Sequence, residues 1–172
     1  VRTAKHFRKN GAITAVIDGP SDRPSDLYFF RSTEKHAQDI GAVIKHLRAK
    51  YSLPVWLAGT SLGTNSVANA AVRLKGGDRL DGIVLTATVT EPSNKGLDHV
   101  MIMALNKIEM PVLIAHHKKD ECYVTPPSGV NRLKEALKNA KPVKVLWCED
   151  AKNPRGMVCA ARHYHGFIGI EK

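Results

Sequence analysis

Residues 55–71 of the chain read VWLAGTSLGTNSVANAA. This stretch opens with a short apolar run, typical of a strand buried on both faces, and after the serine it continues as a helix. A tight turn from strand to helix needs residues without bulk on either side, because the backbone folds back on itself there. Gly59 and Gly63 flank Ser61 at these two places. The pattern therefore predicts a strand, a sharp turn and a helix, with the hydroxyl of Ser61 exposed at the sheet edge.

The rest of the chain repeats this alternation of short apolar runs and segments of helical period. Strands that alternate with helices form a mostly parallel sheet with helices on both faces, so we expect a single three-layer α/β/α domain over residues 1–172. The predicted strands are residues 12–17, 55–59, 82–89, 111–115 and 143–148, and the predicted helices include residues 34–47, 61–74, 97–105, 131–140 and a short one from residue 166.

The chain is strongly basic, but its charge pattern does not favour nucleic-acid binding. It holds 26 Lys and Arg against 16 Asp and Glu, a net charge of +10. The basic residues stand in ones and twos, and no aromatic side chains interleave with them to stack on bases. We therefore predict a solvated basic surface without a nucleic-acid partner. No apolar run approaches the roughly 18 residues that span a bilayer, so no membrane span is predicted.

A serine hydroxyl becomes a good nucleophile only beside a base, and the base needs an acid to orient it. In an open parallel sheet, both partners lie beyond the carboxyl ends of later strands. Asp120 follows the strand at 111–115 and His165 follows the last strand, which gives the chain order serine, acid, histidine. Glu121 is the competing acid and His163 the competing base.

His116 and His117 stand together at a predicted strand end and raise the question of a metal site. No carboxylate or cysteine near them has the spacing of metal ligands, so structural histidines are the favoured interpretation and no metal is predicted.

Three segments resemble the nucleophile, acid and histidine segments of the α/β-hydrolase family: residues 55–71, PVLIAHHKKDECYVTPP at 111–127 and HYHGFIGIE at 163–171. They are more similar to small bacterial esterases and dienelactone-hydrolase-type enzymes than to large lipases. The resemblance implies a catalytic triad of Ser61, Asp120 and His165, with Ser61 on a nucleophile elbow and the Leu62 amide in the oxyanion hole.

The resemblance also implies an activity. A serine esterase of this kind hydrolyses small carboxylic esters through an acyl-enzyme and needs no cofactor. The triad does not fix the leaving group, so a peptidase or a thioesterase is an alternative. A catalytically silent binding module with a hydrolase fold is a third interpretation.

The resemblance further predicts what surrounds the site. Residues 90–110 leave no room for the cap domain that the family commonly inserts at this place. Residues 12–17 match the family's fourth strand and residues 55–59 its fifth, while the third lies between them and its loop supplies a second oxyanion donor. We therefore expect an N-terminally incomplete domain, whose N-terminal segment, if cleaved after folding, would stay bound as a second chain. The strands at 12–17 and 55–59 would then lie about 9–10 Å apart.

Two of the three cysteines are predicted to pair. If Asp120 and His165 meet, Cys122 and Cys159 are tethered close to that meeting point, within reach of a disulfide. Cys148 would remain a free thiol. The bridge would indicate a periplasmic or secreted protein, whereas three free cysteines would indicate a cytoplasmic one.

Overall fold

A four-stranded parallel sheet forms the centre of the computed structural model, which describes residues 3–23, 27–93, 98–150 and 153–170. Each strand pairs with the next one along the chain, in the order β1-β2-β3-β4. All the strands therefore end at the same edge of the sheet, where side chains from their loops can meet. The strands are β1 (Trp56–Thr60), β2 (Gly82–Thr86), β3 (Val112–His117) and β4 (Val143–Cys148).

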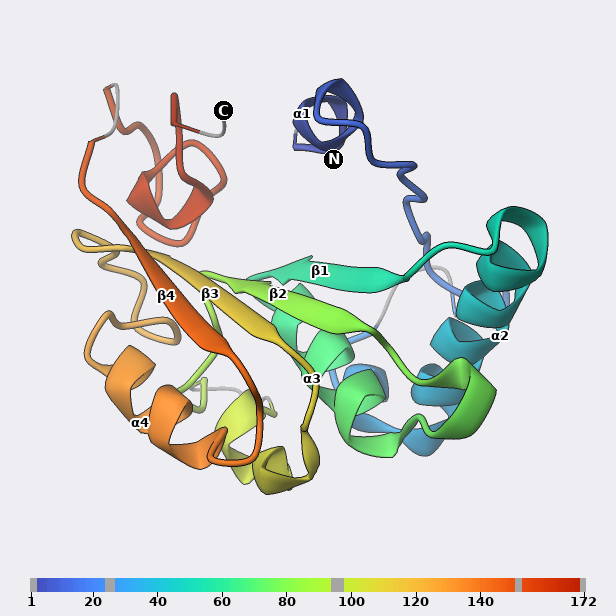
Figure 1. Ribbon diagram of the computed structural model, residues 1–172. Helices are drawn as coiled ribbons and strands as arrows, with labels where there is room; N and C mark the ends of the chain where they lie inside the picture. Colours follow the sequence, from blue (N-terminus) through green and yellow to red (C-terminus); the bar gives the residue numbers. More distant parts are fainter. Residues whose placement is uncertain (1–2, 24–26, 94–97, 151–152, 171–172) are drawn as a thin grey trace.

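In the described part of the chain, helices α2, α3 and α4 lie on one side of the sheet (Figure 1). Figure 1 shows α3 and α4 beneath the strands, with α2 beside α3. The hydroxyl of Thr33 caps α2 by accepting the His36 amide at 3.2 Å. The core between these helices and the sheet includes Ile44, Val67, Ile83, Ile114 and Leu133. The α-helices are α1 (Ala4–Lys9), α2 (Glu34–Tyr51), α3 (Gly63–Arg73) and α4 (Gly129–Ala136), and the 3-10 helices are Phe30–Ser32, Gly76–Asp78, Val100–Ile102, Leu105–Lys107 and Tyr164–Gly166.

The opposite face of the sheet is more open. Helix α1 and the C-terminal segment lie on this side (Figure 1), yet Trp56 on β1 is 50% exposed and Leu146 on β4 is 53% exposed. Gly82 is the partner of Trp56 in the register, and a Cβ there would come within 2.6 Å of the indole ring. The absence of a side chain at Gly82 therefore lets the indole lie across β2.

The prediction of a buried strand at residues 12–17 was wrong. This segment has no regular secondary structure, and its Ile13 and Val16 are 55% and 60% exposed. A run of apolar residues becomes a buried strand only where neighbouring strands pair with it. Among the described residues, only β2 pairs with β1. Residues 12–17 are not a strand of this sheet, so the spacing predicted between two strands does not apply to them.

Three smaller differences concern element ends. The strand predicted at 82–89 stops at Thr86, because Ala87 takes a left-handed conformation with φ of 44°. Of the helix predicted at 97–105, residue 97 lies outside the described residues. Residues 98–105 contain the 3-10 helix Val100–Ile102, an extended Met103 and the start of a second 3-10 helix at Leu105. The helix predicted from residue 166 is the end of a single 3-10 turn. In the described ranges, no helix has both the length and the hydropathy that crossing a bilayer requires.

Candidate active site

The chain turns sharply at Ser61, between the end of β1 and the start of α3. Ser61 has φ of 53°, in the left-handed region that residues other than glycine rarely occupy. Its amide donates to the carbonyl of Thr86 on β2 at 3.0 Å, and its carbonyl accepts the hydroxyl of Thr64 at 2.6 Å. The neighbouring strand and the first turn of α3 thus hold the backbone of Ser61 in this conformation.

The two glycines of the motif have different roles. A Cβ at Gly59 would lie 2.5 Å from the carbonyl oxygen of Gly63 and 2.7 Å from Val67 on α3, so no side chain fits there. A Cβ at Gly63 would meet no atom within 4 Å. The close approach of strand and helix therefore requires a glycine at position 59 and not at position 63.

The amide of Leu62 lies at the N-terminus of α3, where helix N–H groups have no partner within the helix. It donates no hydrogen bond to any group in the described part of the chain. Such an amide, one residue after Ser61, is available to an anion that develops beside the serine.

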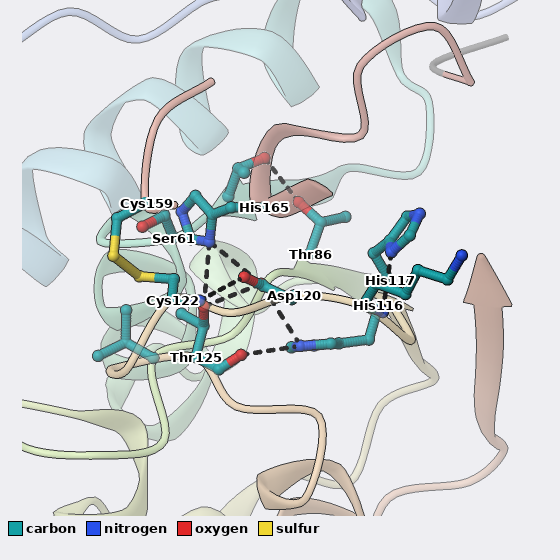
Figure 2. Close-up of polar contacts among 12 residues, drawn as sticks. Ser61, Thr86, His116, His117, Asp120, Cys122, Thr125, Cys159 and His165 are labelled. Atoms are coloured by element: carbon teal, nitrogen blue, oxygen red, sulfur yellow. Dashed lines mark hydrogen bonds and ion pairs between the residues drawn. A yellow bond between two sulfur atoms is a disulfide. The ribbon is translucent and has the colours of Figure 1, made fainter. Parts of the chain in front are cut away.

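The carboxylate of Asp120 is buried at the end of β3 and fully hydrogen-bonded. Its Oδ1 accepts the amide of Cys122 at 3.0 Å, and its Oδ2 accepts the hydroxyl of Thr125 at 2.9 Å. The same Oδ2 lies 3.1 Å from Nδ1 of His165 (Figure 2). Because a carboxylate only accepts, the proton of this last bond sits on Nδ1. Nε2 of His165 is left as the basic nitrogen of the ring.

His165 reaches this position from the C-terminal tail, in the 3-10 turn Tyr164–Gly166. The turn packs so closely that a Cβ at Gly166 would lie 2.1 Å from the carbonyl oxygen of Ala161. Figure 2 shows Ser61 and His165 in the same close-up. Both residues are described, and no hydrogen bond joins Ser61 Oγ to the ring. Bonds of this kind are often long before a substrate binds.

The competing pair of residues meets at the surface. His163 Nε2 lies 3.9 Å from a carboxylate oxygen of Glu121, whose side chain is 63% exposed. The structure therefore pairs Asp120 with His165 in the interior, whereas Glu121 is exposed and lies near His163, whose own side chain is largely buried.

His116 and His117 are both buried. His116 Nε2 donates to the carbonyl of Thr125 at 3.0 Å and lies 3.6 Å from Asp120 Oδ2, while His117 stacks on Tyr164 with ring centroids 4.7 Å apart. Burial lowers the pKa of both imidazoles, with charged neighbours as smaller influences. Within the described ranges, there is no group of three or more His, Cys, Asp or Glu side chains that could hold a metal ion.

The predicted disulfide between Cys122 and Cys159 is present, with the two Cα atoms 4.7 Å apart. It joins the loop that carries Asp120 to the tail that carries His165 (Figure 2). Cys148 is a free, half-buried thiol, and burial raises its pKa.

Comparison with known proteins gives a fold. No protein-family model matches the sequence, and no curated protein is significantly similar to it. Pyrococcus horikoshii acylaminoacyl peptidase has a TM-score of 0.50 at 13% identity over 74% of this chain and 24% of its own. An alpha-beta serine hydrolase homologue from Coxiella burnetii has a TM-score of 0.48 and 22% sequence identity, and the match covers 67% of this chain and 49% of that protein. A Bacillus cereus carboxylesterase has a TM-score of 0.46 and 20% identity, and the match covers 76% of this chain and 58% of that protein.

The chain has the α/β-hydrolase fold. It spans about half the length of the Coxiella protein and about a quarter of the Pyrococcus peptidase. Within this hydrolase fold, Ser61 follows β1, Asp120 follows β3 and His165 comes after β4, so all three stand beyond the carboxyl edge of the sheet.

Two residues of the site in this hydrolase fold were not predicted in the roles they take. Thr125 was not singled out, although its side chain contacts both Asp120 and His165. His116 was interpreted as a structural histidine in preference to a metal ligand, but its bond to the backbone of Thr125 was not predicted. The path of the 118–125 loop brings them together, and no local pattern in the sequence encodes that path.

Proposed function

We propose that this protein is a serine hydrolase that cleaves carboxylic esters through an acyl-enzyme. Ser61 is the nucleophile, His165 the general base, and Asp120 the acid that orients the histidine. The observation that carries the proposal is the bond of 3.1 Å between Nδ1 of His165 and the buried carboxylate of Asp120. That bond leaves Nε2 as the basic nitrogen, and Ser61, with its left-handed backbone, directly follows β1 at the carboxyl edge of the same sheet.

In the first half of the reaction, Nε2 of His165 takes the proton of the Ser61 hydroxyl while Oγ attacks the acyl carbon. The tetrahedral oxyanion accepts the amide of Leu62. The imidazolium, stabilised by Asp120, then gives its proton to the leaving alcohol. In the second half, His165 takes a proton from water while the water oxygen attacks the acyl carbon of the acyl-enzyme. The imidazolium then returns the proton to Oγ of Ser61, and the carboxylic acid leaves.

The test uses a fluorophosphonate probe, which labels an activated serine, together with turnover of p-nitrophenyl acetate. We expect Ser61→Ala to lose labelling and to lose at least about 10³-fold in turnover, because removal of the nucleophile disables the whole triad. The matched control is Ser128→Ala, which removes an exposed hydroxyl that makes no capping hydrogen bond to α4.

Wild-type protein that resists the probe, or a Ser61→Ala variant with undiminished turnover, would refute the proposal. Peptide anilides and thioesters belong in the same assay, since the structures that resemble this chain include a peptidase and a carboxylesterase. If those substrates are turned over faster than esters, the preferred substrate is an amide or a thioester and not a carboxylic ester.

A further inference from the structure

Thr125 occupies an unusual place beside the proposed triad. Its side chain is fully buried, and its Oγ1 lies 2.9 Å from Oδ2 of Asp120 and 3.0 Å from Nδ1 of His165. Since Oδ2 and Nδ1 are themselves 3.1 Å apart, the three atoms form a closed triangle (Figure 2).

The protons of this triangle can be assigned. The carboxylate of Asp120 only accepts, so the single hydroxyl proton of Thr125 goes to Oδ2. The proton on Nδ1 of His165 then points between two acceptors, Oδ2 and the lone pairs of Thr125 Oγ1. The hydroxyl is therefore a donor to the acid and an acceptor from the base, and it fixes where each lies relative to the other.

The backbone of Thr125 is itself held on both sides. Its amide donates at 2.9 Å to the carbonyl of Cys122, which the disulfide ties to the tail. Its carbonyl accepts Nε2–H of His116 at 3.0 Å. His116 has no hydrogen bond on Nδ1 within the described residues, and burial lowers its pKa, which favours the neutral ring. Since a carbonyl only accepts, the proton of the bond to Thr125 sits on Nε2.

We propose that Thr125 is a positioning residue, which holds Asp120 and His165 in the geometry that the reaction needs. This inference rests on the proposed function. Thr125 acts through the acid and the base, and its hydroxyl bonds to groups on the side of the imidazole away from Nε2. Its removal should therefore lower kcat and leave KM nearly unchanged.

The experiment compares Thr125→Val, which removes the hydroxyl at nearly constant volume, with Thr125→Ser, which keeps it. We expect Thr125→Val to lose about 10- to 100-fold in kcat with p-nitrophenyl acetate, the usual effect of one hydrogen bond to a charged group, with KM within about twofold. Thr125→Ser should restore kcat to within about fivefold of wild type. The control Thr88→Val removes another fully buried threonine hydroxyl, one without a partner in the described part of the chain, and should leave kcat unchanged.

A second readout separates positioning from stability. The Nδ1 proton of His165, identified in the proton NMR spectrum by its absence from His165→Gln, should shift in Thr125→Val and return in Thr125→Ser. Wild-type kcat and an unshifted proton in a folded Thr125→Val would overturn the inference, and so would an equal loss in Thr125→Ser. If the valine variant does not fold, Thr125→Ala takes its place with the same expected results.

The two proposals fail in different ways. If Ser61→Ala keeps full turnover, the proposed function is wrong whatever Thr125 does. If Ser61→Ala is inactive while Thr125→Val turns over like wild type, the triad stands and the positioning role of Thr125 alone is refuted.

Discussion

Removal of the disulfide should destabilise this protein by several kcal/mol. Cys122 and Cys159 close a loop across a sequence separation of 37. In the chain-entropy model, a cross-link over about 37 residues stabilises the folded state by about 4 kcal/mol at 25 °C, because it removes conformations from the unfolded chain. We therefore expect the double variant Cys122→Ala/Cys159→Ala to lose about 4 kcal/mol in its free energy of unfolding, measured by urea denaturation.

Activity should be more sensitive than global stability to this change. Residues 153–170, which carry His165, contain a single 3-10 turn and no α-helix or strand. The double variant should therefore lose turnover even at urea concentrations where circular dichroism shows a folded sheet. Dithiothreitol should have the same effect on wild type and none on the double variant, and Cys148→Ala is the control for loss of a thiol.

A double variant within about 1 kcal/mol of wild type, with full turnover, would refute this reasoning. It would mean that noncovalent contacts alone hold the tail against the loop that carries Asp120.

Two further predictions concern the turn and the buried histidine. Gly59→Ala should destabilise the fold by roughly 1–3 kcal/mol, since its Cβ would meet the helix backbone, whereas Gly63→Ala should stay within about 0.5 kcal/mol in the same urea titration. Burial lowers the pKa of His116 below its usual 6.5, so below pH 6.5 the unfolded chain binds a proton there that the folded chain does not. As the pH is lowered below 6.5, the free energy of unfolding should therefore decrease more steeply in wild type than in His116→Gln. The difference in slope should be up to about 1.4 kcal/mol per pH unit, until the pH reaches the pKa of His116 in the folded protein. Equal pH dependence of the two proteins would contradict this prediction.

The sequence was informative where a single segment carries its own signal. The four strands of the sheet are short apolar runs bounded by glycine, proline or charge, and Ser61 stands in a pattern that already demands a sharp turn. The run at 12–17 has the same composition and forms no strand. Composition reports which residues are apolar, whereas burial depends on a pairing partner elsewhere in the chain.

The polar network around the site lay beyond such reasoning for a related reason. The contacts of His116 with Thr125 and of Thr125 with His165 join residues from three segments. Each distance depends on the path of a loop, and no periodicity or motif assigns these contacts to His116 or Thr125. The cysteines were an exception, because their positions in sequence near Asp120 and His165 made their proximity a consequence of that pairing.

The order of the strands also has a consequence for synthesis on the ribosome. Because strands β1 to β4 are adjacent in the same order as in the chain, each can dock on its predecessor as soon as it emerges, without waiting for distant sequence. The last strand of the described sheet ends at Cys148, and His165 comes 17 residues later (165 − 148). A nascent chain would thus carry Ser61 and Asp120 on a formed sheet while still lacking its base. Under the proposed function, hydrolytic activity would therefore arise only in a late step, when residues 153–170 dock and Cys159 reaches Cys122.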